Sequence, residues 1–310
     1  MATDPAASRP APATLAMGAE EATMSNRTPV SQALHGWRKL AWAAWGPPSD
    51  PQFYGDLDID AAAMLDFVAM TRSDAEEPVT VTHLVGRAVA HALHEVPSLR
   101  VAIARGRERP YPTTDVFFII SDPGSDELTG AKIERADAKS VVELARELRA
   151  AAAATRSGDD RSFGQVKHTL DLLPQWAVRP AIRLSSFLAC DLGLDLPALG
   201  IHRHPFGSAM ISSVGMWDVT RAYSPLASYY RVPVLVLVGS VSPRPMAVEG
   251  RVVVRPMVTL TATFDHRYVD GRQAVSFARA IREYCAEPER FEPHLAGLRA
   301  ESVSEASQGR

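Results

Sequence analysis

The hydrophobic and polar positions of this chain follow two different periods, which predicts a mixture of helices and strands. Apolar residues recur at the i, i+3, i+4, i+7 spacing of a helix with one buried stripe in residues 80–96, 140–153 and 273–285. Residues 257–264 instead alternate strictly between apolar residues and threonines, as expected of a strand with one face in the core. Further strands are predicted at 53–60, 100–104, 116–120 and 208–214, and a further helix at 61–70.

One predicted strand differs from the others because it is apolar on both faces. Residues 232–241, VPVLVLVGSV, have no alternation, so we expect them to form a central strand of the sheet. The following stretch, MAVEGRVVV, predicts a hairpin that turns at Glu249–Gly250. The order of helices and strands, without internal repeats, predicts one α/β domain over residues 31–300.

Three segments depart from this pattern. Residues 1–30 are rich in Ala, Pro, Ser and Thr and predict a disordered leader, and residues 301–310 predict a disordered tail. Residues 162–204 predict an inserted helical excursion, with one or two helices broken at Pro180. This excursion fits a packed insertion or a subunit contact. A helix at a membrane surface is less favoured, because its polar face is not strongly basic.

Composition excludes several classes of function. The chain has 310 residues, is 46% hydrophobic and 22% charged, and carries a net charge of −3. It has no basic stripe, which argues against nucleic acid as a partner. No apolar run approaches the roughly 20 residues of a membrane span, and no secretion signal is evident. Cys190 and Cys285 lie in apolar sequence, which predicts buried free thiols in a reducing cytoplasm.

Candidate chemistry is concentrated in FDHRYVDG, residues 264–271. A histidine at the end of a half-buried strand can be held rigidly at a sheet edge, where it can move a proton near neutral pH. A charged turn without chemistry is the alternative, and the residues of this stretch alone do not decide between them. His202 and His204 form a second histidine pair, but they have no third ligand, so we expect a surface turn and no metal.

The pattern His-x-x-x-Asp-Gly resembles the signature of the chloramphenicol-acetyltransferase-like superfamily. Within it, DHRYVDG is similar to the motif of the acyltransferase components of 2-oxoacid dehydrogenase complexes. Other segments resemble the same family in the same order. They cover roughly residues 37–290 and are WRKLAWAAW, FYGDLDIDAAAMLDF, VTVTHLVGRAVAHALHEVPSL and FGSAMISSVGMW.

The resemblance implies a two-layer α/β sandwich with a mixed β-sheet, assembled as a homotrimer with active sites between subunits. By motif position, His266 would be the general base. Ser212 would donate its hydroxyl to the oxyanion, with Ser213 on the opposite face of the strand. Asp270 would pair with Arg38 and hold the histidine loop. Asp265 and Arg267 would give that loop structural support.

The implied activity is acyl transfer between coenzyme A and a thiol, such as a dihydrolipoyl group on a separate protein or dehydrogenase complex. The chain departs from the family in two respects. None of its four lysines lies in a lipoyl-type hairpin, which predicts no covalent lipoyl group on this chain, and its polar tail predicts a free trimer that does not join into a larger cage. Acylation of a small hydroxyl or amine, or a non-catalytic trimer of the same fold, are the alternatives. Tyr229, Tyr230 and Arg231 would either narrow a substrate channel or pack.

Overall fold

The computed structural model describes residues 51–74, 78–121, 128–156, 174–196, 201–226 and 231–292. All of these lie within Asp50–Arg310. Arg38, Tyr229, Tyr230, the leader and the tail lie outside the described residues.

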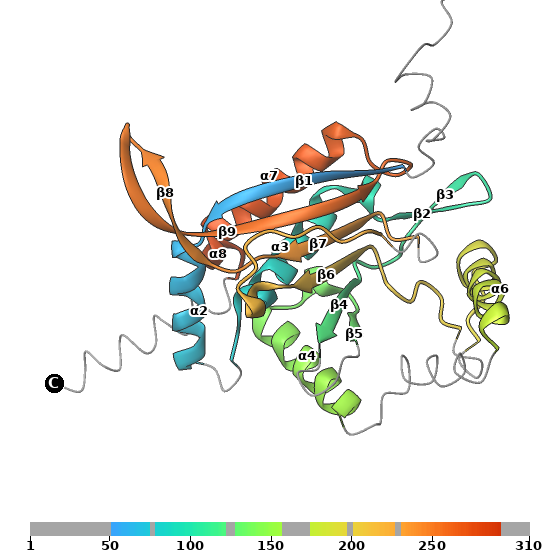
Figure 1. Ribbon diagram of the computed structural model, residues 1–310. Helices are drawn as coiled ribbons and strands as arrows, with labels where there is room; N and C mark the ends of the chain where they lie inside the picture. Colours follow the sequence, from blue (N-terminus) through green and yellow to red (C-terminus); the bar gives the residue numbers. More distant parts are fainter. Residues whose placement is uncertain are drawn as a thin grey trace, which may run out of the picture. The chain divides into compact units, whose positions relative to one another are not determined.

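A seven-stranded mixed sheet forms the centre of the described part (Figure 1). Its order is β1-β9-β7-β6-β4-β5, and β8 pairs with the outer part of β9. The pairs β4–β6 and β6–β7 are parallel, whereas β1–β9, β7–β9, β4–β5 and β8–β9 are antiparallel. The strands are β1 (Gln52–Asp60), β4 (Val116–Ser121), β5 (Leu128–Ile133), β6 (Ala209–Ser213), β7 (Val234–Val238), β8 (Ser242–Val248) and β9 (Arg251–Asp265).

The two central strands behave as their sequences predict. Every residue of β7 is buried, because β7 lies between β6 and β9 and both of its faces are covered. In β9, Val258 and Leu260 enter the main core, and the threonines between them face the other side. There Thr263 donates its hydroxyl to the Ser224 backbone oxygen at 2.7 Å, and Thr261 donates to Ala222. The threonines therefore hold the segment before β7 across that face.

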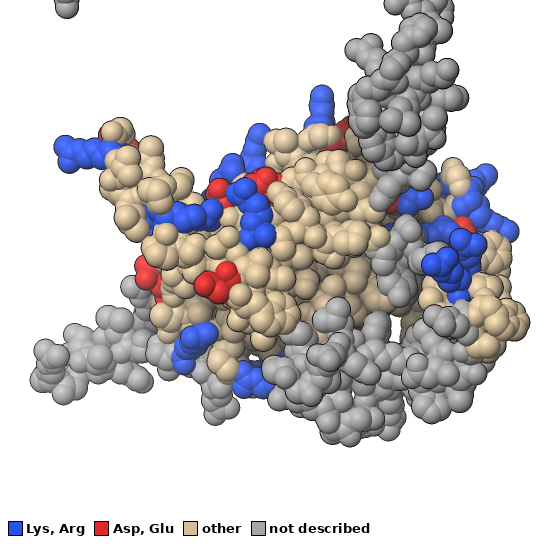
Figure 2. All heavy atoms as spheres, viewed as in Figure 1, with Lys and Arg blue, Asp and Glu red and all other residues tan. Residues whose placement is uncertain are grey.

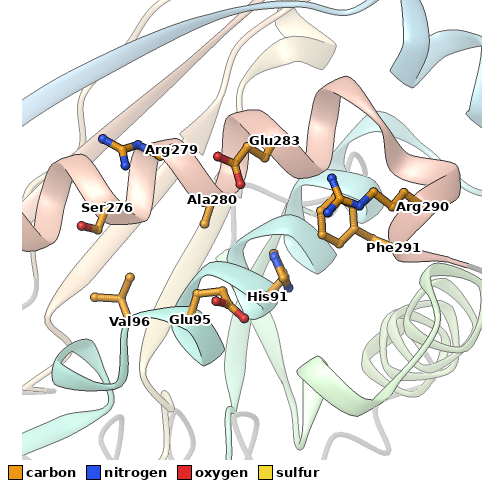
Figure 3. A pocket seen from close by; sticks show the side chains of 9 residues that line it. All are labelled: His91, Glu95, Val96, Ser276, Arg279, Ala280, Glu283, Arg290 and Phe291. Carbon is orange, nitrogen blue, oxygen red and sulfur yellow. The ribbon is translucent and has the colours of Figure 1, made fainter.

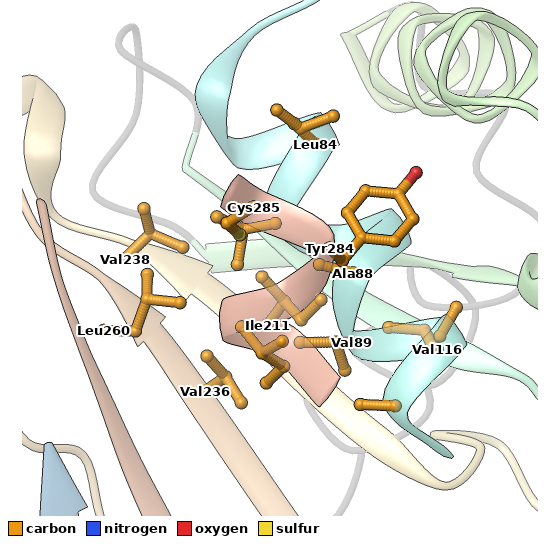
Figure 4. Close-up of a cluster of buried hydrophobic side chains, with 14 of the residues drawn as sticks. Leu84, Ala88, Val89, Val116, Ile211, Val236, Val238, Leu260, Tyr284 and Cys285 are labelled. Carbon is orange, nitrogen blue, oxygen red and sulfur yellow. The ribbon is translucent and has the colours of Figure 1, made fainter. Parts of the chain in front are cut away.

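Helices cover the opposite face and form the second layer of the sandwich. Their residues and one face of the sheet share a continuous apolar core (Figure 4). At Gly86 a Cβ would overlap the ring of Phe118, so α3 lies directly against the sheet. The main helices are α2 (Ala62–Asp74), α3 (Val81–Glu95), α4 (Val141–Arg156) and α7 (Gly271–Ala286), and α8 (Pro288–Phe291) is a single short turn.

Two hairpins extend from this sandwich. The β8–β9 hairpin turns at Glu249 and Gly250, both with positive φ, as the sequence predicted. The second hairpin pairs β2 (Val101–Ala104) with β3 (Arg107–Pro110) as a separate two-stranded sheet. Sequence patterns missed β3 and β5. In β3 the strand is RERP, which is mostly exposed and has no apolar alternation to reveal it.

The predicted break at Pro180 is wrong. Helix α6 (Gln175–Ser186) continues through this residue and passes into a π-helical turn, η3 (Phe187–Asp191). Pro180 is exposed and stands in the second turn, so the helix loses one backbone hydrogen bond near its start. Within the described ranges, no helix combines the length and apolar character needed to cross a bilayer.

Candidate active site

The loop that carries His266 is fixed by backbone hydrogen bonds on both sides. Strand β9 ends at Asp265, whose N–H donates to the Pro233 oxygen at 3.0 Å. The His266 N–H donates to the Pro51 oxygen at 2.8 Å, ahead of β1. Tyr268 donates its N–H back to the Asp265 oxygen at 2.9 Å, which closes a turn. The backbone of His266 is therefore held between two neighbouring chain segments.

Asp265 and Arg267 form a second support directly around the histidine. The Asp265 side chain is buried, and it accepts the Arg267 backbone N–H at 2.9 Å and the Arg267 Nε at 3.0 Å. Arg267 Nη2 donates to the other carboxylate oxygen at 2.5 Å. This two-pronged pair fixes the residues immediately before and after His266.

The His266 ring lies at the surface of the protein, with its plane tilted against Phe53. The two ring centroids are 5.0 Å apart, and Phe53 itself stacks on Phe264 at 5.0 Å. His266 is exposed, so the imidazole has an apolar surface beneath it and remains reachable from solvent. A base that must meet a diffusing thiol needs this combination of fixed position and access.

Asp270 begins the helix that follows the loop. Its carboxylate accepts the N–H groups of Arg272 at 2.8 Å and Gln273 at 3.3 Å, and Gln273 Oε1 accepts the Asp270 N–H at 2.8 Å. Asp270 is thus the N-cap of α7 in a reciprocal capping box. The predicted pairing with Arg38 falls outside the described residues.

Ser212 lies far from His266 within one chain. In the sheet, Ser212 is opposite Leu237 on β7, and Leu237 is opposite Thr261 on β9. Strand spacings of about 4.8 Å and rises of about 3.3 Å per residue put Ser212 roughly 20 Å from His266. Ser212 is half-buried and shares the helix-free face with Met210, whereas Ser213 shares the core face with Ile211. The fold therefore does not bring the two predicted groups together in a single copy.

A series of hydrogen bonds that connects the His266 loop with β2 and η3 was not predicted from the sequence. The Ile103 N–H donates to the Tyr268 hydroxyl at 3.3 Å, and the Ile103 oxygen accepts Arg231 Nη1 at 2.8 Å. Arg231 also forms a two-pronged pair with the buried Asp191 of η3. Burial, the largest influence, raises the pKa of Tyr268. Arg231 therefore packs and connects η3 with β2, and no sequence motif marked Asp191 as its partner.

The remaining histidine and cysteine candidates are structural. His202 lies 3.6 Å from an Asp195 oxygen, and the His204 ring meets Tyr111 edge-on at 4.5 Å. Burial lowers the pKa of His204 to about 4. Cys190 and Cys285 are buried free thiols, as predicted. Burial raises the pKa of the Cys285 thiol to about 12, so it is a poor nucleophile near neutral pH. Among the residues described, no group of three or more potential metal ligands occurs.

A surface hollow of about 410 Å³ lies on the helical layer, between α3, α7 and α8 (Figure 3). None of the predicted catalytic residues lines it. Its walls carry charges of both signs and one partly buried histidine. The lining residues are His91, Glu95, Val96, Ser276, Arg279, Ala280, Glu283, Arg290 and Phe291.

Comparison with known proteins places the chain in one family. The model of the 2-oxoacid dehydrogenases acyltransferase (catalytic domain) family matches residues 48–162 and 205–292. This covers more than half of the chain, so the chain belongs to that family. The matched ranges leave out residues 163–204, which contain α6 and η3.

Curated relatives match short segments. A probable dihydrolipoyllysine-residue succinyltransferase component of the 2-oxoglutarate dehydrogenase complex from Schizosaccharomyces pombe is 49% identical over 49 residues, covering 16% of this chain and 11% of the relative. The corresponding component from Saccharomyces cerevisiae is 40% identical over 85 residues, covering 27% and 18%. The matched segments therefore span less than a fifth of either relative.

Solved structures share the fold over most of the chain. A probable dihydrolipoamide acetyltransferase from Listeria monocytogenes has a TM-score of 0.58 and 20% identity, covering 83% of this chain and 94% of that one. The cubic core of a pyruvate dehydrogenase multienzyme complex has a TM-score of 0.58 and 20% identity, covering 78% and 84%. The predicted two-layer α/β fold with a mixed sheet is confirmed.

Proposed function

We propose that this chain is an acyltransferase that moves an acyl group between coenzyme A and a thiol acceptor. The acceptor is a dihydrolipoyl group on a separate protein. The observation that carries this proposal is the His266 loop, where an accessible imidazole is held by backbone hydrogen bonds to Pro51 and Pro233 and by the Asp265–Arg267 pair on either side of it. Membership of the acyltransferase family supports the same reading.

The reaction requires one general base and one hydrogen-bond donor to the oxyanion. A free thiol has a pKa near 8.5, so only a few per cent is thiolate at neutral pH. His266 accepts the thiol proton as the sulfur attacks the carbonyl carbon of the acyl thioester. The tetrahedral intermediate then collapses, the carbon–sulfur bond to the leaving thiol breaks, and His266 returns the proton to that sulfur. The reaction exchanges one thioester for another, and no oxidant is consumed.

The oxyanion donor comes from a neighbouring copy in this proposal. Ser212 lies roughly 20 Å from His266 within one chain, by the strand spacings of the sheet. A homotrimer that places Ser212 of one copy opposite His266 of the next removes this separation. A serine hydroxyl aimed at the developing negative charge contributes about 3–4 kcal/mol of transition-state stabilisation.

Acylation of a small hydroxyl or amine is the second candidate. It is favoured by residues 163–204, which lie outside the matched family ranges and precede the Ser212 strand. An insertion there can change the acceptor while the histidine chemistry is retained.

The test measures thioester exchange with purified protein, dihydrolipoamide and either acetyl-CoA or succinyl-CoA. We expect turnover by the wild type and a fall of about 10²–10⁴-fold in kcat for His266→Ala. The control is His94→Ala, which alters an exposed histidine of α3 paired with Asp137. Equal rates for the wild type and His266→Ala would overturn the role of the histidine. Turnover of amines or alcohols but not thiols would select the second candidate.

A further inference from the structure

Helix α6 displays exposed apolar side chains next to two exposed arginines. The exposed fractions of Trp176, Leu184 and Phe187 are 80%, 58% and 42%. Arg179 and Arg183 are exposed between them, at the spacing of one helix face. The opposite side of α6, with Val178 and Ile182, is half-buried.

A second basic group lies on the β2–β3 hairpin. Its turn consists of Arg105 and Gly106, with φ of 55° and 72°, and Arg107 follows in β3. Arg105 and Arg107 are exposed. Figure 2 shows Lys and Arg gathered over α6 and over the tip of this hairpin, on the right of the view. We call these two elements together the α6–hairpin surface.

The α6–hairpin surface is connected directly to the His266 loop. The turn η3, which continues α6, contacts β2. There Arg231 binds both Asp191 of η3 and the Ile103 oxygen of β2. The Ile103 N–H in turn donates to Tyr268, two residues after His266. The surface therefore borders the candidate active site through a continuous chain of hydrogen bonds.

The surface carries an excess of positive charge, with Glu108 of β3 as an exposed acid beside its arginines. Among the described residues, no ion pair is formed by Arg105, Arg107, Arg179 or Arg183. Of the described acids of the excursion, Asp191 pairs with Arg231 and Asp195 lies next to His202. Since the whole chain has a net charge of −3, this excess is local. Exposed Trp and Arg side chains are also the residue types enriched at the energetic centres of protein interfaces.

We propose that the α6–hairpin surface is the docking site of an acidic carrier protein, which presents its thiol-bearing arm to His266. The inference rests on the proposed function and adds the partner's chemistry. Carboxylates on the carrier pair with the arginines, while its apolar side chains cover Trp176, Leu184 and Phe187. Two copies of this face would oppose arginines with arginines, which disfavours self-association through it. A membrane surface is the alternative occupant, and vesicle binding in the experiment below distinguishes it from a carrier.

The experiment compares two acceptors with the full chain. One is free dihydrolipoamide, and the other is an isolated lipoyl domain of net negative charge, reduced to its dihydrolipoyl form. The test variant is Arg179→Glu/Arg183→Glu. The matched control is Arg251→Glu/Arg282→Glu, which makes the same charge change at exposed positions of the β8–β9 turn and α7.

We expect the test variant to raise KM for the lipoyl domain about tenfold or more, because charge complementarity governs encounter. Its kinetics with free dihydrolipoamide, its melting temperature and the kinetics of the control should match the wild type. High salt should raise the wild-type KM for the domain toward that of the variant.

Three results would overturn the docking site. These are an unchanged KM for the lipoyl domain in the test variant, a loss of subunit assembly in that variant, and arginine-dependent binding to anionic vesicles without an effect on the domain. If the wild type turns over neither acceptor, the proposed function fails separately. Docking is then read from the Trp176 fluorescence change when the lipoyl domain is added, with Trp176→Phe as control. Absence of wild-type binding in that titration would also overturn the inference.

Discussion

Replacing Asp265 with alanine should loosen the loop that carries His266. The substitution removes the carboxylate that accepts the Arg267 backbone N–H at 2.9 Å and its guanidinium at 3.0 Å and 2.5 Å. Asp265 is 4% exposed, so water does not replace the lost carboxylate as acceptor for the Arg267 backbone N–H. The residue is a positioning residue in our reading, because it acts on His266 through the backbone.

The expected loss of stability follows from how deeply each partner of the Asp265–Arg267 pair is buried. Breaking a fully buried ion pair costs about 3–5 kcal/mol. Here the Arg267 side chain is 52% exposed and regains water when its partner is lost. We therefore expect Asp265→Ala to lower the free energy of unfolding by about 1–3 kcal/mol. A displacement of the imidazole by about 1 Å should lower kcat by about 10–100-fold, with KM for coenzyme A thioesters little changed.

The assay combines thermal unfolding with thioester exchange, and Asp66→Ala serves as an exposed acidic control on α2. Asp265→Asn should be intermediate, since its amide oxygen can still accept the Arg267 N–H. A variant that loses stability as expected but keeps the wild-type kcat would refute the positioning argument. The pair would then matter to the fold alone.

Three further predictions concern stability. Burial lowers the pKa of His83 to about 4, and neutral Nδ1 accepts the Thr80 N–H at 3.3 Å. The unfolded chain therefore binds a proton between about pH 6.5 and 4 that the folded chain does not, and wild-type stability should fall by about 3 kcal/mol at most across that window. His83→Gln keeps an acceptor and should flatten this dependence in denaturant titrations. The Thr259 hydroxyl, 2.6 Å away, is the largest influence that lowers the pKa of Asp58. Asp58→Asn should cost less than about 1 kcal/mol at pH 7, and this cost should disappear as the pH falls through the lowered pKa of Asp58. Gly207 precedes β6 with a φ of 62°, and a Cβ there would overlap a backbone oxygen. Gly207→Ala should lower the melting temperature by several degrees, about 2–4 °C per kcal/mol, and an unchanged value would contradict the close approach.

The sequence by itself determined most of the helices and strands and the buried face of each. The alternation in 257–264 and the uniformly apolar 232–241 specified β9 and β7, because burial of side chains follows the period of a strand. The i, i+3, i+4 stripes specified α3, α4 and α7 for the same reason. Strand β3 was not predicted because most of its residues are exposed and show no apolar alternation. Helix α6 continues through Pro180 because the loss of one backbone hydrogen bond there does not end the helix.

The tertiary structure alone decided which polar groups meet. Arg231 binds Asp191 and Ile103, which are distant in the sequence, and no periodic pattern of hydrophobic residues predicts such pairs. It also decided that Ser212, on β6, lies far from His266, in the loop after β9. The hydrophobic pattern selects a face for each residue, whereas the distance between two side chains depends on strand order and register. These follow from how the whole core packs.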